Sequence, residues 1–139
     1  MWRRTRPDPA AEAAWAGFLG FARALDEGSR ALLATVPSAR RPGAPLEAGM
    51  AGFLAGLEAA RAELGTWDHP ALAGARAATA AALDAAERRA RDLPAAMKGR
   101  EFEHRNERVV EVLDELQPVQ AAERAVRDLR RGRQPALAG

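Results

Sequence analysis

Proline and glycine residues divide this chain into four long segments, and the apolar residues within each segment repeat at helical spacing. In residues 9–34 the large apolar side chains recur at intervals of three, four and seven, which places them along one stripe of an α-helix. β-branched and aromatic residues are too sparse for a sheet, whereas the helix-favouring Ala, Leu, Arg and Glu dominate. The sequence therefore predicts an all-α fold.

The predicted helices cover residues 9–34, 46–64, 70–93 and about 100–131, with Asp8 as the first N-cap, Gly65 as a left-handed cap and Pro94 as a stop. Pro118 falls inside the last apolar pattern, and because it lacks a backbone donor we expect a kinked or split helix there. Short or moderate links favour antiparallel neighbours. We therefore expect an up-down-up-down four-helix bundle, a single domain over residues 1–139 with flexible tails at 1–7 and 132–139.

Composition and hydropathy argue against several kinds of protein. The chain has no cysteine, which excludes disulfides, thiolate metal sites and iron–sulfur clusters. No segment offers the roughly 18 uncharged apolar residues of a membrane helix. The apolar run after Trp15 is too short and too close to acidic residues for an export signal. We therefore expect a cytoplasmic protein that does not engage a membrane.

The small positive net charge of +2 comes from the two ends of the chain. Residues 1–6 and 130–139 each carry three arginines, and without these six the remaining 15 basic residues face 19 acidic ones. This balance disfavours a basic nucleic-acid-binding face. A nucleic-acid accessory protein that uses its Arg-rich tails remains an alternative hypothesis, although no aromatic residue alternates with those arginines for base stacking.

Residues able to carry chemistry are few. Glu101 and His104 form one Glu-x-x-His motif, but a di-iron bundle needs that motif on two helices. With Glu107, they fall on the face opposite the apolar stripe, where charge pairs in solvent are expected. His69 precedes Pro70, and either it or Asp68 suits the cap of the third predicted helix. We therefore predict no catalytic residue, no metal, no cofactor and no enzymatic activity.

The second predicted helix is small or apolar on two faces. One of them carries Gly49, Gly52, Gly56 and Ala60. Each glycine in a helix costs about 1 kcal/mol relative to alanine, so three of them indicate a close helix–helix contact. The sequence leaves open whether that interface lies within the chain or across a dimer axis.

Two charged residues lie at or inside the apolar stripes. Asp26 lies at the edge of the first stripe and Arg61 lies within the second. Unpaired charges are rarely buried, so each should reach the rim or take a partner, and a carboxylate of the third or fourth helix could pair with Arg61. The alternative is a ligand pocket formed with Trp15, Phe18 and Phe53.

These patterns favour a non-enzymatic interaction or structural protein. It would associate with itself, as a homodimer, or with another helical protein through the second and third helices, which have few charges and small side chains. A small-molecule-binding helical bundle is the alternative.

Overall fold

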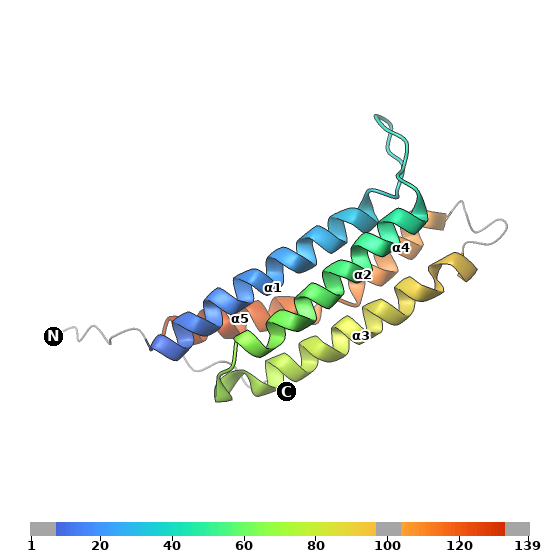
Figure 1. Cartoon of the computed structure of the whole chain (residues 1–139). Helices are drawn as coiled ribbons and strands as arrows, with labels where there is room; N and C mark the ends of the chain where they lie inside the picture. Colours follow the sequence, from blue (N-terminus) through green and yellow to red (C-terminus); the bar gives the residue numbers. More distant parts are fainter. Residues whose placement is uncertain (1–7, 97–103, 133–139) are drawn as a thin grey trace.

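The computed structural model describes residues 8–96 and 104–132, and α-helices make up most of this part of the chain. The helices are α1 (Pro9–Leu33), α2 (Leu46–Glu63), α3 (Ala73–Ala96), α4 (Arg105–Asp114) and α5 (Pro118–Arg130). Figure 1 shows α1, α2 and α3 side by side, with α4 and α5 following each other along the remaining side. The predicted all-α helical bundle is confirmed.

The helix starts follow the capping residues that the sequence offers. Asp8 accepts a hydrogen bond from the amide of Ala10 at 3.0 Å, which caps α1. His69 caps the short 3-10 helix before α3, because its Nδ1 accepts from the amide of Ala71 at 3.1 Å. Pro118 is the first residue of α5, where its fixed φ suits a helix start. The predicted split of the last helix is thus confirmed.

Two predicted helix ends are wrong. Gly65 has no left-handed conformation and lies in a 3-10 helix, Leu64–Thr66, which tightens the chain after α2. Pro94 does not stop α3, which continues through it to Ala96. A proline so close to a helix end interrupts only one backbone hydrogen bond near the terminus, where few remain to be lost.

The apolar stripes of all the helices meet in one core. α1 and α2 supply the larger side chains, and α3 supplies mostly small ones. Fully buried members are Phe21, Leu32, Phe53, Leu57, Leu72, Leu83, Ala86, Ala90, Val109, Val112 and Val126. The alanine-rich α3 therefore contributes to the core by packing close to the neighbouring helices rather than through large side chains.

Pairs of residues fix how the helices run relative to α1. Gly28 in the last third of α1 faces Gly56 near the middle of α2, and Thr35 faces Gly49 at the end near their link, so these two helices are antiparallel. Arg105 donates to the carbonyl oxygen of Thr35 at 3.2 Å, while Arg130 lies 3.2 Å from Glu12 at the other end. The rod made by α4 and α5 is therefore also antiparallel to α1.

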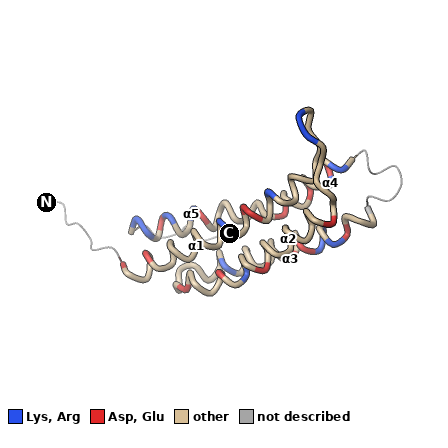
Figure 2. The backbone as a smooth tube through the Cα atoms, turned by 45° about the horizontal axis from the view of Figure 1, so that its top comes forward, with Lys and Arg blue, Asp and Glu red and all other residues tan. Residues whose placement is uncertain are grey.

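The link between α1 and α2 projects beyond the helices (Figure 1). A bridge between Ser38 and Arg41 closes its tip, and the amide of Ala44 donates to Ala34 at 2.8 Å. Figure 2 shows basic residues at this tip and both signs of charge along the helices.

The predicted tails lie mostly outside the described residues; Gly132, with φ 75°, follows the last turn of α5. No helix in the described part of the chain is long and apolar enough to cross a membrane.

Candidate functional site

The glycines of α2 make close contacts with other residues of the same chain. Gly56 meets the backbone of Gly28, Gly52 meets the side chain of Ala31, and Gly49 meets Thr35. A Cβ atom on Gly52 would lie 2.6 Å from the Cβ atom of Ala31. Ala60 is fully buried in the core. The close contact that the sequence predicts is therefore the α1–α2 contact, and these glycines are covered by α1.

Arg61 joins α2 to α3. Its guanidinium donates to Glu87 at 2.8 Å and to Asp84 at 3.0 Å. The hydrogen bond from Arg61 lowers the pKa of Glu87 below its ordinary value, because it stabilises the carboxylate. Burial works against the charge of Arg61, but the two carboxylates outweigh it and raise its pKa. Arg61, which the sequence pattern places inside the apolar stripe of α2, is thus paired with carboxylates of α3.

Asp26 does not meet Arg61. It forms an ion pair of 3.0 Å with Arg30, one turn along α1, and its side chain is exposed to solvent. Phe53 is fully buried and Phe18 almost fully. The structure therefore does not bring Trp15, Phe18, Asp26, Phe53 and Arg61 around one cavity.

The aromatic residues instead form a packed cluster. Phe18 lies 5.4 Å from Trp67, with their rings nearly perpendicular at 89°, and 6.3 Å from Trp15. The Trp15 ring is also approached by Arg127 and Arg130, whose guanidinium carbons lie 5.7 and 5.3 Å from its centroid. This cluster joins the first turns of α1 to the end of α5.

Sequence reasoning missed the role of Trp67. It lies in the link between α2 and α3, yet it is fully buried, and its indole nitrogen has no hydrogen-bond partner in the described part of the chain. A large aromatic residue in a link of about nine residues was the available signal, because loop backbone rarely carries such a side chain unless it enters the core.

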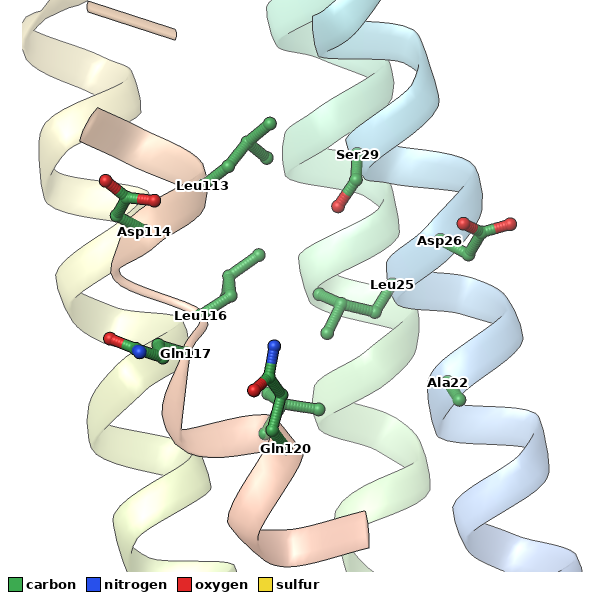
Figure 3. Close-up of a pocket in the computed structure, with 10 residues that line it drawn as sticks. Ala22, Leu25, Asp26, Ser29, Leu113, Asp114, Leu116, Gln117 and Gln120 are labelled. Carbon is green, nitrogen blue, oxygen red and sulfur yellow. The ribbon is translucent and has the colours of Figure 1, made fainter. Parts of the chain in front are cut away.

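A groove separates α1 from the rod made by α4 and α5 (Figure 3). Its volume is about 690 Å³. Leu113 and Leu116 point into it from α4 and the residues after it, while Leu25 and Ser29 point into it from α1. It lies beside the break between α4 and α5, since Leu116, Gln117 and Val119 are among the residues that line it.

Three large apolar side chains are exposed on α1 and α4, and none of them lines this groove. Leu19 on α1 is 46% exposed, Leu33 on α1 47% and Val110 on α4 42%, and these are the exposed large hydrophobic residues within 8–96 and 104–132. Leu19 and Leu33 share one line along α1 with Asp26, a groove residue. The exposed large apolar side chains of the described residues therefore lie on α1 and α4.

A second hollow of about 520 Å³ lies between α2 and α3 and is less open than the groove beside α1. Its floor includes Leu54, and charged residues that include Arg61 and Glu87 border it. Since these two already pair with each other, the hollow offers mostly alanine methyl groups and satisfied charges.

The histidines lie at helix starts. His69 is 3.5 Å from Asp8 and uses its other nitrogen to cap a helix, and His104 is 3.3 Å from Glu107 on an exposed face. Glu101 lies outside the described residues. Within the described ranges, no three acidic, cysteine or histidine side chains lie together as a metal site would require.

Comparison with known proteins gives no relative to guide these assignments: no family model, no curated protein and no solved structure matches the chain.

Proposed function

We propose that this protein is a non-enzymatic helical-bundle interaction protein that associates with itself. The observation that carries the proposal is the exposure of Leu19, Leu33 and Val110 on the neighbouring helices α1 and α4. A single exposed apolar residue is ordinary, whereas several on neighbouring helices can contribute to a surface that binds another protein. Helical partners bind such surfaces through apolar residues at helical spacing.

The proposed surface differs from the one that the helical pattern favoured. The sequence pointed to the second and third helices, but the glycine face of α2 packs on α1. The outer faces of α2 and α3 carry mainly alanine, which offers little area for burial. The larger side chains of α1 and α4 therefore make the better contact surface.

The non-enzymatic part of the proposal rests on what the polar side chains already do. His69 is engaged in a helix cap, Arg61 in an ion-pair cluster and the two buried threonine hydroxyls in bonds to backbone carbonyl groups. None of these described groups combines a nucleophile with a base.

Size-exclusion chromatography with light scattering, from low to high micromolar concentration, tests self-association. We expect the mass to rise from about 15 kDa towards twice that value as concentration increases, given a chain of 14.9 kDa. A strict monomer at high micromolar concentration contradicts this part of the proposal.

One observation favours a second candidate, a small-molecule-binding bundle. The groove between α1 and the α4–α5 rod has the volume of a ligand site and combines Leu25 and Leu113 with the polar Ser29 and Gln120. A thermal-shift screen tests it, with Leu113→Trp as the variant that fills the groove. A ligand that stabilises the wild-type protein and not this variant supports the second candidate; stabilisation of both contradicts it.

A further inference from the structure

The ring of His69 lies where the start of α1 meets the link before α3. Its Nδ1 atom accepts a hydrogen bond from the amide of Ala71 at 3.1 Å and so caps the 3-10 helix Pro70–Leu72. Its Nε2 atom lies 3.5 Å from a carboxylate oxygen of Asp8, whose other oxygen caps α1 through the amide of Ala10. One imidazole ring therefore joins two helix starts that are far apart in the sequence.

These two contacts determine which nitrogen of the neutral ring carries the proton. An imidazole nitrogen that accepts a hydrogen bond must present a lone pair, so the Nδ1 atom of His69 carries no hydrogen and Nε2 carries the ring proton. The N–H group at Nε2 then faces the carboxylate of Asp8, which is the complementary arrangement of charge. The next proton that the ring takes up must bind at Nδ1, the atom that makes the cap.

We propose that His69 is a pH-sensitive latch that holds the first turn of the α3 region in place only while its ring is neutral. A protonated Nδ1 atom is a donor and cannot accept from the amide of Ala71, so the cap opens when the imidazolium forms. The positive ring then keeps only its contact with the carboxylate of Asp8. Histidine changes its charge between about pH 5 and pH 8, so the latch opens and closes under mild conditions.

The charged groups around His69 leave Asp8 as its partner. In the link and α3, Asp68 and Arg76 lie 3.4 Å from each other. The end of α5 also packs against the 3-10 helix. Its charged residues are Arg124, Asp128 and Arg131, together with Arg127 and Arg130, which pair with Glu123 and Glu12. Among the described residues, the carboxylate of Asp8 is the one within ion-pair distance of the ring.

The burial of the neighbouring residues keeps the opening local. The His69 side chain is only 18% exposed, so water has little access to the closed cap. Trp67 and Leu72, which lie on either side of it in the chain, are fully buried in the core. Loss of the cap therefore releases one turn between two fixed anchors and leaves the rest of α3 in place.

The other described histidine, His104, gives an internal comparison. It precedes α4 as His69 precedes the 3-10 helix, but its side chain makes no cap hydrogen bond. Its ring lies 3.3 Å from Glu107 and is 56% exposed. Protonation of His104 therefore breaks no cap, and the amide of Asn106, two residues later, should not respond as the amide of Ala71 does.

The tautomer of His69 is the first test. Long-range proton–nitrogen NMR correlations at pH 8 should show that Nε2 carries the ring proton and Nδ1 carries none. A neutral ring with its proton on Nδ1 overturns the proposal, because that atom could not then accept from the amide of Ala71.

Hydrogen exchange at the amide of Ala71 measures the cap itself. His69→Asn is the matched variant, because asparagine also caps helices but takes up no proton. Pro70 precedes Ala71 in both proteins, so the intrinsic exchange rate of this amide is the same. The ratio of the wild-type rate to the His69→Asn rate should rise about fivefold between pH 8 and pH 5, which is the effect of losing a typical cap.

His69→Ala lacks the cap at every pH, so its Ala71 amide should exchange faster than that of His69→Asn by the same factor at pH 8 and pH 5. A ratio of wild type to His69→Asn that stays constant over this range overturns the latch. A rise that extends equally to core amides such as those of Phe21 and Leu83 also overturns it, because acid would then loosen the whole bundle. The latch lies within one chain, so these outcomes do not depend on the proposed self-association.

Discussion

Gly28 of α1 and Gly56 of α2 meet backbone to backbone, and a Cβ atom on Gly56 would lie 2.6 Å from the Cα atom of Gly28. Gly56→Ala should therefore destabilise the fold by about 1–3 kcal/mol through overpacking, despite the better helix propensity of alanine. Urea unfolding followed by circular dichroism measures the change.

Gly74→Ala is the matched control for that substitution. Gly74 lies in the first turn of α3, and a Cβ atom there meets nothing within 4 Å. This variant should be neutral or more stable by up to about 1 kcal/mol. Equal changes in the free energy of unfolding for Gly56→Ala and Gly74→Ala would contradict the close contact between Gly28 and Gly56.

The ion pair between Arg61 and Glu87 should make stability depend on pH. The pKa of Glu87 is lower in the folded than in the unfolded protein, chiefly because of its hydrogen bond from Arg61. Its contribution is therefore complete above the ordinary carboxyl pKa and is lost as pH falls through the folded value. The wild type should be more stable than Glu87→Gln at pH 7, and this advantage should shrink on acidification to about pH 3.

Glu58→Gln serves as the reference for this pH effect, since Glu58 is exposed on α2. Melting temperatures at both pH values give the comparison. If the difference in melting temperature between the wild type and Glu87→Gln is the same at pH 7 and pH 3, the charge of the Glu87 carboxylate does not contribute to stability.

Trp67 should contribute to stability mainly through its packing. Its ring is fully buried against Phe18 and Phe21, so Trp67→Ala should cost about 3–5 kcal/mol. Trp67→Phe should cost clearly less, because it keeps an aromatic ring and removes a buried N–H group without a partner in the described residues. Denaturant unfolding measures both, and equal losses would show that the indole nitrogen has a partner such as water.

Trp15 and Arg130 should be energetically coupled. Arg130 lies over the Trp15 ring at 5.3 Å and also pairs with Glu12 at 3.2 Å. A double-mutant cycle of Trp15→Leu and Arg130→Gln should give a coupling of about 0.5–1 kcal/mol. The same cycle with Arg131→Gln, an exposed neighbour, should give none; a coupling of zero for Arg130 would mean that the contact is not held in solution.

The helical pattern in the sequence predicted the helices better than it predicted the residues of the candidate site. Asp8, His69 and Pro118 mark helix starts through local chemistry, so the sequence alone located them. Of the five proposed pocket residues, Trp15 and Phe18 lie together, while Asp26 and Arg61 line different hollows. Helical spacing tells which side of a helix a residue occupies and not which helix lies opposite. Arg61 illustrates this: its position within a stripe was evident, but Asp84 and Glu87 became its partners only through the packing of α3.

The sequence by itself determined that this chain forms helices with one apolar stripe each, because helix propensity, capping and periodicity act over a few neighbouring residues. Only the tertiary structure decided that the glycines of α2 lie against α1 and that Trp67 enters the core from a link. It also decided that Leu19, Leu33 and Val110 stay exposed on neighbouring helices. These outcomes depend on how close two helices can approach and which faces remain uncovered, and both are properties of the packed bundle rather than of any one segment.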